Sequence, residues 1–344
     1  GPYFDQLSTL IFPTLKRHLA SVSLENFSEM FYYMVKIMRK CTGMRKIFFD
    51  NVTLPVFETK KQWFELSEKC LTEASQNRKR ILKKYKNVNL QDEDQVEEIA
   101  DELAEVSDLY RKVMEFIGEV LKTELNEESL LFIKDTVAPL YKELLQNGIG
   151  SDEVTIGLCY FVDLLEFGPT TLLMELAPEV LQSASHYFQT YNDDSVKQTA
   201  AYLIGTVILR KRQALNAFEM QTAQILFAYL SSNPEPSDLV DNVVSALFKI
   251  IITSPEFSSS SDGCRLLESI ADKVPLKNDM EESVTFSKLL CAVMGNATSL
   301  LHASEGYKVL LRAMLISIRN KDRETKFLDE KTSSLVNALA IYFP

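Results

Sequence analysis

Helix-length apolar segments recur along this chain at an almost constant interval. With Gly205 as the marker, the corresponding places in the neighbouring segments are Asp163, Phe248 and Cys291, in steps of 42 to 43 residues. A period of roughly 40 to 47 residues made of two helices is typical of HEAT and armadillo stacking, because one helix pair cannot bury its own apolar face. The sequence therefore predicts an all-α fold, an α-solenoid of about seven HEAT-type helix pairs. Its function is then expected on a surface and not in a pocket.

Composition agrees with this class and argues against nucleic-acid binding. Only 11 Gly and 11 Pro occur among 344 residues, which leaves little room for the many turns of an all-β fold. The formal net charge is −11, and a sequence-independent grip on phosphate backbones needs clustered Lys and Arg. An acidic surface attracts basic peptides or domains instead. No direct nucleic-acid partner is expected.

The chain carries no motif for catalysis, metal binding or membrane insertion. Its three histidines lack Cys or His neighbours at ligand spacing, and no nucleophile-elbow glycine pattern surrounds a serine. We therefore expect no enzyme activity, no metal and no cofactor. No apolar run reaches the roughly 20 residues of a bilayer span, and no signal peptide is visible. The scattered cysteines, odd in number, indicate reduced thiols in a reducing compartment: Cys41, Cys70, Cys159, Cys264 and Cys291.

Apolar spacing and helix-end signals divide the chain into pairs of helices. We expect one solenoid over residues 1–344, with an irregular repeat at 60–123 and the most regular repeats at 128–295. Gly1-Pro2 suggests a remnant of protease cleavage, so a fragment of a longer protein is expected. The helices expected in the regular part are 129–146, 152–167, 170–190, 194–210, 217–231, 237–253, 260–273 and 279–295, and a last pair is expected at 304–342.

The irregular repeat changes sign of charge along its length. A long helix has a basic end, and an acidic insertion follows it that includes Asp92, Glu93, Asp94, Glu97 and Glu98. One interpretation is a helix hairpin whose basic and acidic ends screen one another across a solvated turn. The other is that the acidic segment engages a basic partner.

The second helix of each pair is expected to line a concave face open to a large ligand. In the helix at 194–210, Val196, Ala200, Leu203 and Val207 share one face, and a step of about 100° per residue directs other side chains to the opposite face. Carboxylates there bind Lys and Arg by charge-assisted hydrogen bonds, and an Asn amide binds a peptide backbone. The candidate cargo-binding residues are Asp163, Glu166, Gln198, Tyr202, Asp241, Asn242 and Ser245. The alternative is that the acids serve as helix caps, as expected for Asp152, Asp194, Asp238 and Asp279, or only keep the surface soluble.

The segment Asp193–Gly205 contains Val-Lys-Gln followed by Ala-Ala-Tyr-x-x-Gly. It resembles an inner helix of the importin beta superfamily, in particular of its importin five (karyopherin beta three) class. The Gly157–Glu166 helix and the acidic Gln91–Glu98 segment are also similar to it, as are Asp241–Ile250 and Val274–Glu282. Phe248 stands where that family has a glycine.

This resemblance implies a nuclear transport receptor that shuttles between cytoplasm and nucleus. It implies basic cargo proteins such as ribosomal proteins or histones, release by the GTPase Ran, and possible contacts with nucleoporins. It also implies a carboxy-terminal part of a chain about three times longer. The alternative from the residues is a general HEAT-repeat assembly scaffold, such as a phosphatase or chromosome-complex subunit.

Overall fold

The structure is a computed structural model that describes residues 24–48, 60–86, 93–122, 127–148, 150–213, 215–232, 234–253, 260–296 and Leu310. The chain divides into two compact units, Gly1–Leu172 and Leu173–Pro344. Within the described ranges every regular element is a helix. The predicted all-α class is therefore confirmed. The helix pair expected at 304–342 lies outside the described residues, apart from Leu310.

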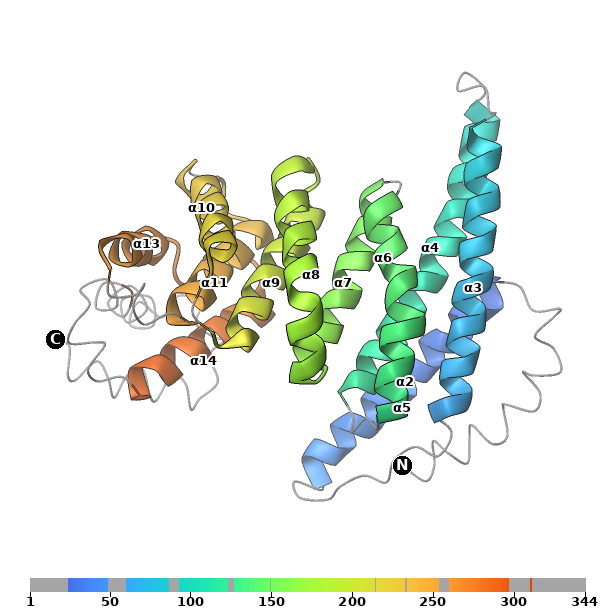
Figure 1. Ribbon diagram of the computed structural model, residues 1–344, viewed down its shortest axis with the longest axis horizontal. Coiled ribbons are helices and arrows are strands. Elements are labelled where there is room, and N and C mark those ends of the chain that lie inside the picture. Colours follow the sequence, from blue (N-terminus) through green and yellow to red (C-terminus); the bar gives the residue numbers. More distant parts are fainter. Residues whose placement is uncertain are drawn as a thin grey trace. The chain divides into compact units, whose positions relative to one another are not determined.

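The first unit is built from two layers of helices. One layer holds α2 (Leu24–Phe48), α4 (Glu93–Leu121) and α7 (Gly150–Phe167), with α4 packed between the other two. The other holds α3 (Lys60–Tyr85), α5 (Glu127–Phe132), the π-helical turn η1 (Ile133–Val137) and α6 (Ala138–Asn147) (Figure 1). Consecutive helices in antiparallel pairs, each packed on its neighbours, are the arrangement that the repeat period predicts.

Three buried tyrosines form the centre of this unit. The Tyr141 and Tyr160 rings stack at 4.1 Å between centroids, and Tyr110 meets Tyr141 edge-on at 5.7 Å. The Tyr141 hydroxyl donates to the Tyr110 carbonyl oxygen at 2.8 Å, so its polar end is satisfied inside the core. Complete burial raises the pKa of both Tyr141 and Tyr160 well above the ordinary value. These rings therefore act as core residues that join α4, α6 and α7.

A buried ion pair ties α3 to α7. Arg78 Nε donates to Glu153 Oε1 at 2.6 Å, and its Nη2 donates to Glu153 Oε2 at 2.8 Å and to the Asn147 carbonyl oxygen at 2.5 Å. Both side chains are at most 5% exposed. The planar guanidinium matches the carboxylate with two parallel bonds, a geometry that Lys lacks.

The expected helix at 129–146 is interrupted by the π-helical turn before Pro139. The Ala138 N–H donates to the Ile133 carbonyl oxygen, five residues earlier. Proline has no N–H, and its ring collides with the carbonyl four residues before it in a regular helix. A single π-turn widens the backbone at this point, a known way to accommodate such a clash. The helix thus continues past the proline after an adjustment that periodicity did not predict.

The second unit repeats the two-layer plan. One layer holds α9 (Asp194–Lys211), α11 (Asp238–Thr253) and α14 (Met280–Asn296), with α11 packed on both others. The other holds α8 (Thr170–Thr190), α10 (Ala217–Ser231) and α13 (Ser261–Ala271). Contacts between α8 and α10 include a hydrogen bond at 2.9 Å between the Ser185 and Thr222 hydroxyls. The helices expected from sequence agree with these bounds to within two residues at each end.

A close approach at Gly205 brings α9 against α11. A Cβ atom at position 205 would lie 2.8 Å from Ala246 Cα and 3.0 Å from Ala246 Cβ, closer than carbon atoms approach one another. Val196, Ala200, Leu203 and Val207 are buried, as expected. Gly205 itself is buried as well.

Helix starts in this unit are capped by side chains, but two of the expected caps are one residue off. Asp193, and not Asp194, accepts from the Ser195 and Val196 N–H groups at the start of α9. Ser237, and not Asp238, accepts from the Val240 N–H at the start of α11, at 3.3 Å. The expected cap at Asp279 is confirmed, because its Oδ1 accepts from the Glu282 N–H at 3.0 Å.

Two further features bear on earlier expectations. Cys70, Cys159 and Cys264 form no disulfide, and burial raises the pKa of Cys70 to about 12, as expected for a core residue. None of the helices in the described ranges has both the length and the apolar character needed to cross a bilayer.

Candidate functional site: an acidic surface and a buried polar network

The first two candidate residues, Asp163 and Glu166, lie near the carboxyl end of α7 in unit 1, both partly exposed. The Asp163 carboxylate rests directly on the backbone of α4 at Gly118, where a methyl group would overlap its Oδ2. Gly118 therefore allows the carboxylate to lie between the two helices. No basic residue occupies the last turn of α7, so its carbonyl dipoles and these two carboxylates add up to a negative end.

Charged groups from α2 and α4 surround this end of α7. Arg39 Nε lies 3.1 Å from Glu119 Oε1, and Lys122 Nζ lies 3.0 Å from the same oxygen. Burial raises the pKa of Asp163 to about 6, Lys122 lowers it, and Glu166 and Glu119 raise it further. At neutral pH the carboxyl is therefore mostly ionised, but it titrates much closer to neutrality than an ordinary aspartate.

Exposed aromatic rings border the same helices. Phe167 at the end of α7 is 38% exposed, and Lys122 Nζ lies 5.1 Å from the centre of its ring. On α2, Tyr33 is 58% exposed and Tyr32 carries Lys36 Nζ at 4.1 Å from its ring centre. Aromatic faces next to carboxylates suit Lys and Arg side chains, since the aliphatic stem packs on a ring while the charged end meets an acid. We call Asp163, Glu166 and Phe167 the acidic surface.

The other five candidate residues lie in unit 2, and three of them are not on an open face. Asp241, Asn242 and Ser245 of α11 are only 4%, 1% and 1% exposed. Asp241 Oδ2 accepts from the Asn278 and Asp279 N–H groups at 2.6 and 2.9 Å, and Asn242 Nδ2 donates to Asp279 Oδ2 at 2.9 Å. These side chains are thus occupied in fixing α11 to the start of α14. The expectation that they line an open groove is not met in this structure, because α14 covers the face that helical periodicity alone left open.

A buried ion pair continues this polar network along α11. Lys249 Nζ lies 2.6 Å from Glu282 Oε1, both side chains are 3% exposed, and Ser245 Oγ donates to the same Glu282 oxygen. Lys249 Nζ also lies 4.7 Å from the centre of the Tyr202 ring. The network therefore joins α9, α11 and α14 through one lysine.

Gln198 and Tyr202 of α9 are partly exposed. Tyr202 faces Lys249 with its ring, so it contributes a structural cation–π contact in addition to any role at the surface. Asp241 has a raised pKa because burial outweighs the backbone hydrogen bonds that it accepts at the start of α14. Of the seven candidates, Asp163, Glu166, Gln198 and Tyr202 remain accessible.

The acidic insertion forms the first turns of α4. Asp92 lies outside the described residues, and the side chain of Glu93 is not described. Asp94 and Glu97 are exposed, whereas Glu98 Oε1 lies 3.1 Å from Lys84 Nζ on α3. Lys84 also lies 3.0 Å from Glu102 Oε1, and hydrogen bonds to Glu102 and Glu98 raise its pKa. These contacts are the ones that the helix-hairpin interpretation predicts.

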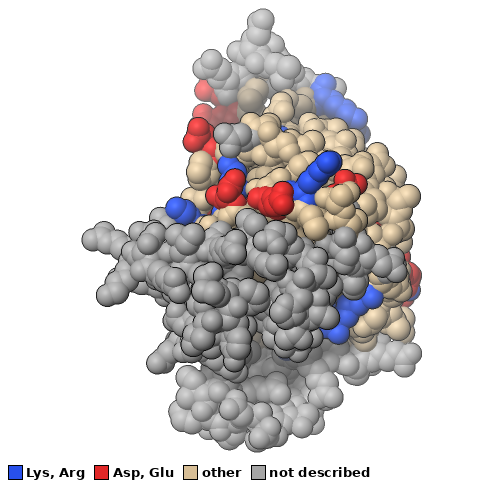
Figure 2. Space-filling model, turned by 90° about the vertical axis from the view of Figure 1, so that its left-hand side faces the viewer, with Lys and Arg blue, Asp and Glu red and all other residues tan. Residues whose placement is uncertain are grey.

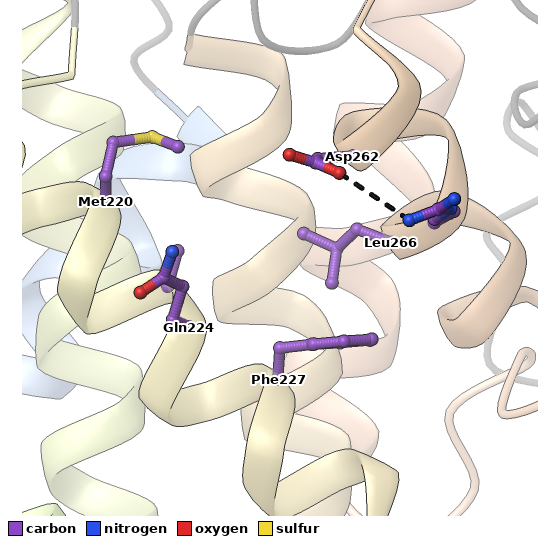
Figure 3. Close-up of a pocket in the computed structure, with 7 residues that line it drawn as sticks. Met220, Gln224, Phe227, Asp262 and Leu266 are labelled. Atoms are coloured by element: carbon purple, nitrogen blue, oxygen red, sulfur yellow. Dashed lines mark ion pairs between the residues drawn. The ribbon is translucent and has the colours of Figure 1, made fainter.

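A shallow apolar groove lies between α10 and α13 in unit 2 (Figure 3). Met220, Gln224 and Phe227 of α10 face Asp262 and Leu266 of α13 across a volume of about 290 Å³. The Asp262 carboxylate lies 4.0 Å from Arg265, and both side chains are more than three-quarters exposed.

On the face shown in Figure 2, acidic and basic side chains of the described residues lie interspersed.

Sequence reasoning missed the partners that define both polar regions. Gly118 contacts Asp163 of the acidic surface, Arg39 pairs with the neighbouring buried Glu119, and none of these three residues carried a distinctive local pattern. Lys249 did carry one: it is the sole charged residue in 243–252, a run in which every other residue except Ser245 is apolar. A lysine in such a run requires a buried partner or an opening to solvent, and the structure supplies Glu282.

Comparison with known proteins relates this chain to solved structures by its fold. No family model matches the sequence, and no curated protein matches it. Among solved structures, the karyopherin Kap121p in its complex with the SUMO protease Ulp1p is similar in fold, with a TM-score of 0.59 and 15% sequence identity. The likeness covers 99% of this chain and 30% of the karyopherin chain. The fold is therefore that of a karyopherin-type helical solenoid, and this chain spans less than a third of that neighbour's length.

Proposed function

We propose that this chain is part of a nuclear transport receptor of the importin beta superfamily, of the importin five class, which binds basic segments of cargo proteins. The observation that carries the proposal is the likeness in fold to a karyopherin over 99% of the chain. That karyopherin is bound to a protein, the protease Ulp1p. The sequence resemblance noted above supports the same class independently of the fold.

The acidic surface of unit 1 is the cargo contact that this proposal assigns. Asp163 and Glu166 supply carboxylates at the negative end of α7, and the partly exposed Phe167 supplies an apolar face for a side-chain stem. Gln198 and Tyr202 of unit 2 are the further contacts assigned. Cargo binding here needs no chemistry beyond charge, hydrogen bonds and packing, so the proposal includes no enzymatic step.

In the whole receptor, GTP-bound Ran is proposed to release the cargo, and nucleoporins are proposed as partners during passage between cytoplasm and nucleus. Ribosomal proteins and histones are the cargo classes proposed, because their lysine- and arginine-rich segments complement a chain of net charge −11.

The test is binding of a fluorescently labelled Lys/Arg-rich peptide, followed by anisotropy at about 150 mM salt, where charges beyond one Debye length are screened. We expect Asp163→Lys to weaken binding about tenfold, since a charge-assisted contact of about 1.5 kcal/mol is lost. Asp272→Lys is the matched control, because Asp272 is an exposed residue after α13 and its replacement changes net charge equally. It should change affinity less than twofold.

Equal weakening by the two substitutions would show that only net charge attracts the peptide, and would refute the assigned surface. For the receptor as a whole, cargo capture by the full-length protein should be lost when GTP-loaded Ran is added. Capture that persists with Ran would favour the general assembly scaffold instead.

A further inference from the structure

The Asp163 carboxylate occupies an unusual place for an acid on a helix. It lies in the last turns of α7, where the aligned carbonyl groups disfavour negative charge. It also lies against the α4 backbone at Gly118, where part of its hydration is lost. Helix position and partial burial thus act in the same direction, since both favour the neutral form.

The charges that face Asp163 offset these effects only in part. Lys122, directly after α4, favours the ionised form, but Lys122 is already paired with Glu119 of α4, which has the opposite effect. From α2, Arg39 favours the ionised form and is likewise paired with Glu119. From α7 itself, Glu166 disfavours it. The α6 side of α7 contributes apolar contacts at Tyr141 and Leu145.

We infer that Asp163 makes the acidic surface proton-controlled: basic segments bind while its carboxylate is ionised, and binding weakens when it takes up a proton. The inference rests on the proposed function, since it concerns the regulation of the same surface. A bound Lys or Arg side chain favours the ionised form of Asp163. By linkage, peptide binding therefore releases a proton from those molecules in which Asp163 is still protonated.

Gly118 is the second residue on which this proton control depends. A side chain there would displace the carboxylate from the α4 backbone toward solvent, and a carboxylate is a movable group that can give way. Restored hydration would return its titration toward the ordinary range near pH 4. The proton sensitivity of the surface is therefore set by the absence of a side chain at position 118.

The experiment measures affinity for a histidine-free Lys/Arg-rich peptide between pH 7.5 and 5.5 at constant ionic strength. With the pKa of Asp163 at about 6, the ionised fraction falls about fourfold over this range, and wild-type affinity should fall by the same factor. Asp163→Asn should bind weakly and without this dependence. Gly118→Ala should bind tightly at both pH values, and Asp272→Asn should behave as wild type.

A readout without peptide accompanies these titrations. The backbone amide resonance of Gly118 should shift with a midpoint near pH 6 in the wild-type chain and stay constant in Asp163→Asn. A pH-independent wild-type affinity, or an unchanged pH dependence in Asp163→Asn, overturns the inference and leaves cargo binding standing. Absence of peptide binding at every pH overturns the proposed function together with this control of it.

Discussion

The buried pair of Lys249 and Glu282 allows a quantitative test of what holds unit 2 together. Both side chains are 3% exposed, with Lys249 Nζ 2.6 Å from Glu282 Oε1. Removing one partner of such a pair leaves an uncompensated buried charge, which costs about 3–5 kcal/mol. We therefore expect Lys249→Met to destabilise the unit by about 3–5 kcal/mol, because Glu282 would keep only the Ser245 hydroxyl as a donor.

The double variant separates the cost of a lone charge from the value of the pair itself. Lys249→Met combined with Glu282→Gln leaves no buried charge, and the Gln carbonyl oxygen still accepts from Ser245. We expect the double variant to lose only about 1 kcal/mol, in line with the near-neutral replacement of buried ion pairs by uncharged groups. The coupling energy of the cycle is then several kcal/mol, well above the 0.5 kcal/mol within which independent sites add.

The assay is native-state hydrogen exchange of the amides in α11 and α14, which reports local opening of these two helices, supported by urea unfolding of the whole chain. If the single substitutions each cost less than about 1 kcal/mol, or if the double variant costs their sum, the ion pair does not hold α11 and α14 together.

Three other expectations concern unit 1 and the helix contacts. Asp163→Asn should stabilise the chain by about 1–2 kcal/mol at pH 7.5, a figure already reduced for the partial exposure of Asp163, and should give no gain near pH 4. The reason is that the pKa of Asp163 is raised to about 6, so the contribution of this carboxyl group to stability falls as the pH rises from about 3.8 to 6. Urea midpoints at both pH values measure this, and an equal gain at both would contradict it. Arg78→Lys should cost about 2–3 kcal/mol in the same assay, because Lys cannot make both bonds to Glu153; a loss below 0.5 kcal/mol would count against the bidentate geometry. Gly205→Ala should cost about 1–3 kcal/mol, because the added methyl group clashes with Ala246. Gly118→Ala should be neutral or stabilising, because its methyl group meets only the movable Asp163 carboxylate. Thermal unfolding midpoints measure both variants, and similar midpoints would refute this contrast.

Helix positions in the regular part could be predicted from sequence because they depend on local signals. The cap at Asp279 and the apolar spacing of Val196, Ala200, Leu203 and Val207 each depend on residues within one short stretch of chain. The π-turn before Pro139 was not predicted, since a proline inside a helix can be accommodated by a bend, a break or a widened turn.

The candidate site residues differ in whether a neighbouring helix covers them. Asp163 and Glu166 stayed on the surface, but Asp241, Asn242 and Ser245 are buried under α14. Helical periodicity states which residues share a face, and it does not state which neighbouring helix occupies that face. The partner at Asp279 lies 37 residues after Asn242, beyond the range of any local pattern.

By itself, the sequence determined the helical class, the repeat period and nearly all helix bounds of the regular part, because these follow from the spacing of apolar residues and from caps along one short stretch of chain. Only the tertiary structure decided which polar side chains are surface contacts and which are internal ties. That choice depends on Gly118 admitting a carboxylate between two helices and on Lys249 meeting Glu282 from another repeat. Burial is a property of all the elements around a residue, so no single segment specifies it.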